Sequence, residues 1–157
     1  MASSDPRSDD PFRVFRSRRG RAVATSMGVL SVVIFCGLAL LLPAQGGLTN
    51  WSAPDRVLVA AIGVAIATLC WRYATIRAVP TREGLLVRNL FTTRQLTWPQ
   101  VLRVQYGGGA PWVTLDLDDT DTLAVMAIQR ADGDASAAEA SRLQALVQAL
   151  GEAPHPG

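Results

Sequence analysis

Two long apolar stretches fill much of the first half of the chain. The first, "AVATSMGVLSVVIFCGLALLL", is uncharged for 21 residues, and about 20 helical residues cross the ~30 Å hydrocarbon layer of a bilayer. The second, "VLVAAIGVAIATLCW", reaches spanning length if it continues to Ile76 with Arg72 turned towards the headgroups. We therefore predict a transmembrane helical hairpin over residues 22–76, with spans of about 22–43 and 57–76.

Two alternatives compete with this prediction. A cleaved signal peptide would explain the first stretch, but the stretch is long for a signal sequence and "LLPAQ" lacks an A-x-A cleavage site. Buried helices of a soluble domain would explain both stretches, but they need a larger surrounding core than the remaining residues can build. The membrane hairpin is the favoured interpretation.

Short segments with alternating apolar and polar residues follow the second stretch. In "GLLVRNLFTTRQLTW" the pattern predicts a strand with Leu85, Val87 and Phe91 on one face, a turn at "FTTR" and a returning strand with Leu96 and Trp98 on one side. Gly84 ends the turn "TREG" and is expected to take a positive φ. Pro99 suits the first position of a short helical turn, and "LRVQY" resumes as a strand.

A second hairpin is predicted further along the chain. Two segments of strand character, "PWVTLDL" and "TLAVMAI", flank turn-forming residues at 118–120, and the inward face consists of Val113, Leu115 and Leu117. The three glycines at 107–109 precede a strand and no "GK[ST]" follows, so we interpret them as a strand connection and not as a phosphate loop. The acidic run "DLDDTD" lacks the glycine and the glutamate of an EF-hand calcium loop.

One amphipathic helix is predicted at the C-terminal end. Ser136 and Glu139 have the spacing of a capping box, and Gly151 is a stop signal. The apolar stripe consists of Leu143, Leu146, Val147 and Leu150. We expect the sheet to cover this stripe, and packing on another protein chain is the alternative. Together the segments predict a membrane-anchored α+β protein: the helical hairpin, then a small PH-like antiparallel β-barrel or sheet over residues 77–151, closed by one C-terminal α-helix.

The segment "EGLLVRNLFTTRQLTWPQV" also resembles a known family. Its glycine-led strand, its "RN-x-F" turn and its Trp98 followed by Val101 are similar to the bacterial PH domains of small actinobacterial membrane proteins, of the low molecular weight protein antigen six type. The resemblance extends over residues 12–151. It implies a membrane-tethered PH-like fold, in a family whose members are mostly of uncharacterised function. The resemblance therefore predicts an architecture but no catalysed reaction.

The arginines predict the orientation in the membrane. Arg13, Arg16, Arg18, Arg19 and Arg21 precede the first span, and Arg72 lies near the end of the second. The connecting loop contains only Arg56. The positive-inside rule then places both termini in the cytoplasm, in a multi-pass protein of the plasma membrane. We expect residues 1–21 to be a disordered basic tail and residues 152–157 to be a second disordered tail.

The distribution of charge argues against a nucleic-acid partner. The net charge is +2, but residues 1–21 hold six Arg and three Asp, whereas the chain from Arg77 onward holds seven Arg and nine acidic residues. The positive surplus therefore lies beside the membrane, where it meets anionic lipid. A slightly acidic domain is a poor match for a phosphate backbone.

The chain offers few groups for catalysis. Cys36 and Cys70 both lie in the apolar stretches, and the single histidine, His155, lies in the Pro-rich tail "EAPHPG". This arrangement does not suit a catalytic triad, a Cys–His pair or a zinc site. We therefore expect no enzyme, no metal and no cofactor.

Two functional hypotheses remain. In the favoured one, the domain binds a protein partner through an open barrel edge or a groove beside the C-terminal helix. In the alternative, it binds anionic lipid headgroups. The candidate contacts for either ligand are Arg82, Arg94, Arg103 and Trp98.

Overall fold

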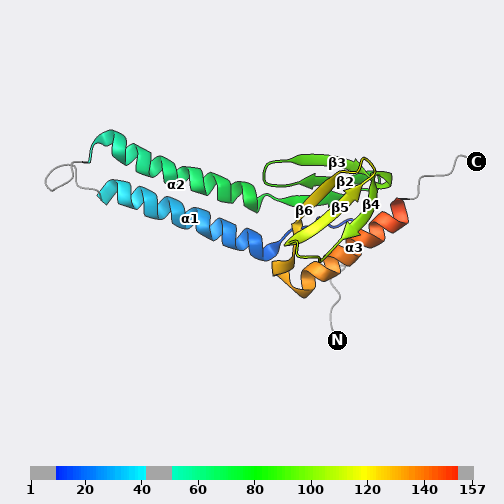
Figure 1. The fold of residues 1–157 in the computed structure, drawn as a ribbon. Helices are drawn as coiled ribbons and strands as arrows, with labels where there is room; N and C mark the ends of the chain where they lie inside the picture. Colours follow the sequence, from blue (N-terminus) through cyan, green and yellow to red (C-terminus); the bar gives the residue numbers. More distant parts are fainter. Residues whose placement is uncertain (1–9, 42–50, 152–157) are drawn as a thin grey trace, which may run out of the picture. The chain divides into compact units, whose positions relative to one another are not determined.

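The computed structural model describes residues 10–41 and 51–151 (Figure 1). The described residues form two compact units. One unit contains residues 20–75, and the other combines the chain before residue 20 with the chain after residue 75. The predicted tail at 152–157 and the first nine residues lie outside the described residues.

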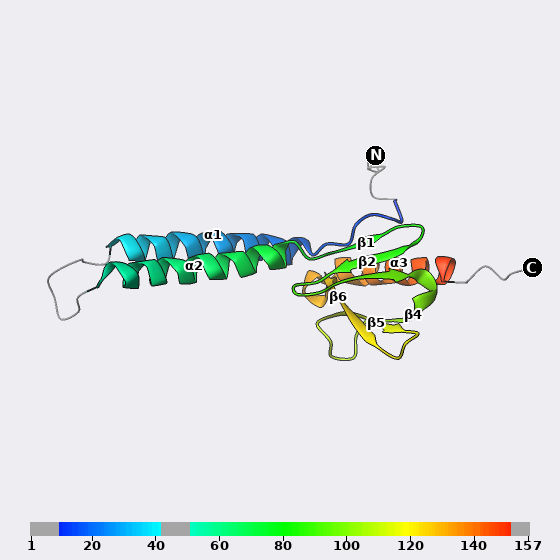
Figure 2. The same ribbon diagram turned by 90° about the horizontal axis from the view of Figure 1, so that it is seen from above.

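The first unit is a pair of antiparallel helices, α1 (Arg18–Leu41) and α2 (Ala53–Ala74), which lie side by side in Figures 1 and 2. Small residues bring them together. Ser31 Oγ donates a hydrogen bond of 3.2 Å to the carbonyl oxygen of Gly63. A Cβ atom at Gly63 would lie 2.4 Å from the Cβ of Phe35, so a larger residue there would push the helices apart.

Both helices are long and apolar enough to cross a membrane by length and composition. Large apolar side chains such as Val29 and Leu58 are exposed along them, unlike those of a helix inside a soluble core. Their bounds differ by a few residues from the predicted spans. The arginines before residue 22 join α1 because arginine is a good helix former, and α2 begins early because Asp55 accepts a hydrogen bond from the Ser52 backbone N–H, 2.9 Å away.

The second unit contains two antiparallel three-stranded sheets. Sheet A has the order β1 (Arg77–Pro80), β2 (Gly84–Arg88), β3 (Thr93–Thr97), and sheet B has the order β4 (Val101–Gln105), β5 (Trp112–Leu117), β6 (Thr122–Gln129). The short helical turn Trp98–Gln100 joins the two sheets, and a second turn, Arg130–Asp132, leads into α3 (Asp134–Leu150). Figures 1 and 2 show α3 lying beside sheet B.

The alternation of the strands produces the core. Its buried side chains come from both sheets and from α3, and include Leu85, Val87, Leu96, Val113, Leu115, Leu117, Leu143 and Leu146. The inward face of the second hairpin, the turn at 118–120 and the Pro-led turn are therefore as predicted. The glycines at 107–109 form a strand connection, and all three have positive φ.

The prediction for Phe91 was wrong. β2 ends at Arg88, so Phe91 lies in the β2–β3 turn and its side chain is 76% exposed. Phe91 is in phase with Leu85 and Val87, but the polar Asn89 between them interrupts the apolar alternation where the strand ends.

The prediction for Gly84 was also wrong, because its φ is not among the positive ones. Gly84 pairs with Thr97, and a Cβ atom on it would lie 2.0 Å from the carbonyl oxygen of Leu96. The glycine is required for the close approach of two strands and not for a left-handed turn.

Ser136 and Glu139 do not form the predicted capping box. The N-cap of α3 is Gly133, three residues earlier, and its φ of 64° is positive. Ser136 is buried; its hydroxyl donates to the Gly133 carbonyl oxygen at 2.8 Å and lies 2.7 Å from the Tyr106 hydroxyl. Glu139 instead forms ion pairs with Arg13 and Arg142.

The segment before α1 differs from the disordered tail that we expected. Phe15 is fully buried and exchanges two backbone hydrogen bonds with Ala78 of β1, at 2.9 and 3.1 Å. The guanidinium carbon of Arg142 lies 3.8 Å from the centre of the Phe15 ring. Arg142 also donates to the carbonyl oxygens of Pro11 and Arg13, at 2.9 and 2.8 Å. Residues 10–17 are therefore part of the folded domain.

Candidate binding groove

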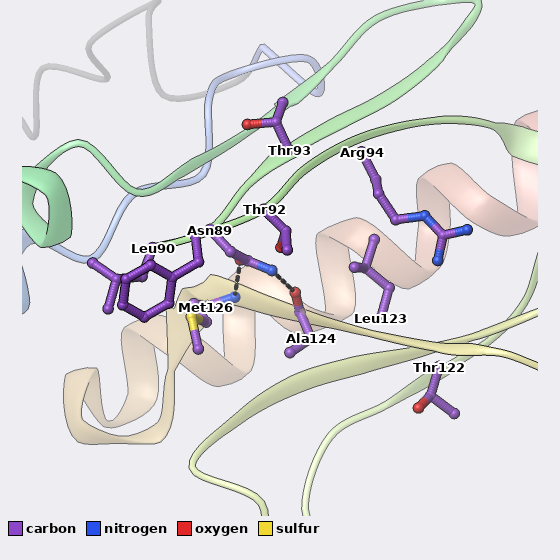
Figure 3. A pocket seen from close by; sticks show the side chains of 10 residues that line it. Asn89, Leu90, Thr92, Thr93, Arg94, Thr122, Leu123, Ala124 and Met126 are labelled. Atoms are coloured by element: carbon purple, nitrogen blue, oxygen red, sulfur yellow. Dashed lines mark hydrogen bonds between the residues drawn. The ribbon is translucent and has the colours of Figure 1, made fainter.

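An open groove lies between the β2–β3 turn and β6. We call it the hairpin groove, and its volume is about 570 Å³. Its lining is formed by Asn89, Leu90, Phe91, Thr92, Thr93, Arg94, Thr122, Leu123, Ala124 and Met126. Figure 3 shows the side chains of the turn and of β6 around it.

The amide of Asn89 connects the two sides of the groove. Asn89 Nδ2 donates to the Ala124 carbonyl oxygen at 2.7 Å, and Asn89 Oδ1 accepts from the Met126 N–H at 3.2 Å (Figure 3). A side-chain amide has the same donor and acceptor as a peptide group. The Asn89 side chain therefore satisfies two backbone groups of β6 that a neighbouring strand would otherwise bind. The Asn89 side chain thus joins the end of β2 in sheet A to the edge strand β6 of sheet B.

An ion pair lies at one end of the groove. Arg94 Nη1 donates to Asp121 Oδ2 at 2.7 Å, and a second guanidinium nitrogen lies 3.7 Å from Asp119 Oδ2. The hydrogen bond from Arg94, followed by that from the Thr122 backbone N–H, lowers the pKa of the Asp121 carboxyl. The pair is exposed, so it adds little to stability, but it neutralises the one arginine that lines the groove.

The remaining lining is mainly apolar. Leu90, Leu123, Ala124 and Met126 supply aliphatic surface, and the exposed Phe91 lies in the turn. Binding sites for side chains and small ligands commonly combine such a surface with a few polar groups. Methionine adapts its shape to different ligands. The hairpin groove therefore suits an apolar group flanked by hydrogen-bonding atoms.

The four candidate contact residues lie in different places. Arg82 is exposed in the β1–β2 turn, and Arg103 on β4 is paired in register with Asp116 of β5. Trp98 is 1% exposed, and its Nε1 donates to the Thr81 carbonyl oxygen at 3.0 Å, so its ring is part of the core. Of the four, the groove includes Arg94 alone.

The arginines that we expected to orient the protein have several local roles. Arg13 binds Glu139, and Arg19 Nη1 donates to the Ala131 carbonyl oxygen at 3.4 Å. Arg16 is exposed before α1, whereas Arg18 and Arg21 belong to its first turn and Arg72 to the last turn of α2.

Sequence reasoning missed Asn89 and the β6 residues of the groove. Asn89 is recognisable locally as a turn former, but its partners Ala124 and Met126 lie more than 30 residues away in the chain. No local pattern could have indicated that pairing.

Two small antiparallel sheets followed by a C-terminal helix are the elements of a PH-like domain. A family model described as "bacterial PH domain" matches residues 76–146. Uncharacterized proteins of Mycobacterium bovis and Mycobacterium tuberculosis are 32% identical to this chain over 119 residues, which is 76% of this chain and 77% of each relative. No solved structure matches. The chain belongs to the bacterial PH domain family, as the resemblance of its β2–β3 segment implied. The PH fold is a non-catalytic binding fold.

Proposed function

We propose that the protein is a membrane-tethered binding or scaffolding module, held on the cytoplasmic face by α1 and α2, and that it recognises a protein partner through the hairpin groove. The observation that carries this proposal is the groove itself, an apolar surface whose one arginine is already paired with two aspartates. An apolar side chain of a partner would lie along Ala124 and Met126.

The same observation favours a protein over a lipid headgroup at this site. A headgroup phosphate needs guanidinium groups that are open to it, whereas Arg94 is occupied by carboxylates and Trp98 is buried. Arg82 lies in the β1–β2 turn and Arg103 on β4, so neither lines the groove. Headgroup binding through these three arginines is the alternative function, and the crosslinking experiment below tests it at Arg94, which lines the groove together with Thr92.

Ala124→Trp should block the groove. Burying one large apolar side chain contributes about 1.5–3 kcal/mol, so loss of the site should weaken partner binding roughly 10- to 100-fold. We would place a photoreactive residue at Thr92, which lines the groove and is exposed, and measure crosslinks in native membranes. The crosslink to a discrete protein should disappear in the Ala124→Trp variant.

Ala138→Trp is the matched control, because Ala138 is exposed on α3, away from the groove lining. It should leave the crosslink unchanged. Crosslinks from Thr92 to lipid in place of protein, unaffected by Ala124→Trp, would reject the protein-binding proposal and favour the headgroup alternative.

The topology that we propose can be tested separately. Phe15, before α1, pairs with Ala78, after α2, so both ends of the helical pair belong on one side of the membrane. The arginines near these ends favour the cytoplasmic side. In a variant without Cys36 and Cys70, Ala53→Cys should react with an impermeant external reagent; this position is exposed and leaves the Ser52–Asp55 cap intact. A reporter fused after Gly151 should be cytoplasmic, and an external reporter would reject the topology.

A further inference from the structure

Two arginines face each other at one end of sheet A. Arg77 of β1 is paired in register with Arg88 of β2, so their side chains lie on the same face of the sheet. Like charges directly opposite each other are destabilising. Within residues 10–41 and 51–151, neither arginine has an ion pair, and Arg77 Nε is buried without a hydrogen-bond partner. An anion placed between the two guanidinium groups would relieve this repulsion.

An exposed apolar turn lies at the same end. The β2–β3 turn begins immediately after Arg88, and it carries Leu90 and Phe91 at its tip. Phe91 is 76% exposed, the highest value among the large apolar side chains that the structure describes in this unit. Cationic groups and an exposed aromatic ring are therefore neighbours at one end of the sheet.

The connectivity of the chain shows that this end of sheet A is the one that follows α2. α2 ends at Ala74, and Arg77 is the third residue after it. Only Thr75 and Ile76 therefore separate the Arg77 end of β1 from α2 along the chain. Arg82, in the β1–β2 turn, belongs to the opposite end of the same strands.

We propose that Arg77, Arg88, Leu90 and Phe91 form a lipid-facing edge that contacts the bilayer surface. The two guanidinium groups bind lipid phosphates, which removes their mutual repulsion. Phe91 and Leu90 enter the interfacial layer, where aromatic side chains are favoured. The edge does not select a headgroup; it holds the domain in one orientation on the membrane. This inference rests on the membrane tether of the proposed function. The edge shares Leu90 and Phe91 with the lining of the hairpin groove, so the partner would contact the β6 side of the groove while the tip of the turn contacts lipid.

A bilayer fits this edge better than a protein partner does. The edge is bound covalently, through two residues, to a helix of membrane-spanning length. Its chemistry also matches the boundary between phosphates and acyl chains, because only Asn89 separates Arg88 from the apolar tip in the chain.

The test uses the purified full chain in lipid nanodiscs, in a variant without Cys36 and Cys70. An environment-sensitive fluorophore is attached at Phe91→Cys or, as a matched control, at Leu102→Cys. Leu102 is also apolar and 66% exposed, but it lies on β4. Lipids that carry a nitroxide quencher near the headgroup should cause a loss of fluorescence at position 91 and little or none at position 102.

Equal quenching at the two positions would overturn the proposal, and so would quenching at position 102 alone.

The role of the arginine pair is tested by changing the lipid composition. Quenching at position 91 should be stronger in nanodiscs with phosphatidylglycerol than in phosphatidylcholine alone, and Arg88→Gln should reduce that difference. A response that is independent of anionic lipid would reject the role of the arginines. No protein partner is present in this experiment. The quenching can therefore be absent while the crosslink from Thr92 to a protein is found, and the quenching can be found while that crosslink is absent.

Discussion

Phe15→Ala should destabilise the PH-like domain by about 3–5 kcal/mol, the usual cost of truncating a fully buried phenylalanine. The Phe15 ring is 0% exposed and lies against the guanidinium of Arg142. Its loss leaves a cavity and also removes the aromatic face on which this cation lies. We would measure urea unfolding of the full chain in nanodiscs by pulse proteolysis, with cleavage between Ile76 and Gly151 as the signal.

Arg16→Ala is the matched control, because Arg16 is the next residue and is exposed. It should change the free energy of unfolding by less than about 0.5 kcal/mol. If Phe15→Ala were equally silent, the segment before α1 would not belong to the domain.

Leu143→Asp should unfold the domain entirely. Leu143 is 0% exposed on the face of α3 that contributes to the core. An unpaired buried carboxylate costs several kcal/mol, and the lost apolar contacts add to this cost, against a total stability of about 5–15 kcal/mol. The measurable result is the loss of hydrogen-exchange protection in β5 and β6, whereas the amides of α1 and α2 should stay protected.

The neighbouring change Gln144→Asp separates burial from the effect of charge on the helix. Gln144 is exposed on the same helix, so an aspartate there should leave the strands protected. Retained protection of β5 and β6 in Leu143→Asp would show that the α3 stripe is not part of the core.

Much of the fold could be predicted from the sequence because its signals are local. Alternation of apolar residues identified the second hairpin with Val113, Leu115 and Leu117 inward, and helical spacing identified Leu143 and Leu146 as buried. Errors occurred at the ends of elements. Phe91 is in phase with Leu85 and Val87 although β2 ends at Arg88, and Ser136 had the spacing of a cap although it lies inside α3.

The candidate site could not be predicted in the same way. Arginines were chosen as contacts by their charge, but whether an arginine is available depends on carboxylates that folding brings near it. Arg94 and Asp121 are 27 residues apart in the chain and form an ion pair. Asn89 and Phe15 owe their roles to partners on β6 and β1 that local patterns do not indicate.

The pairing of Phe15 with Ala78 also sets an order for biosynthesis. The ribosome makes the strand-like segment first and then both apolar helices, and only afterwards β1, which supplies its partner. Phe15 therefore lacks its native neighbours until α1 and α2 have been synthesised. Arg142, which covers its ring, emerges still later. The helical pair is in effect an insertion within the PH-like domain, so the domain completes its fold only after α3 has been synthesised.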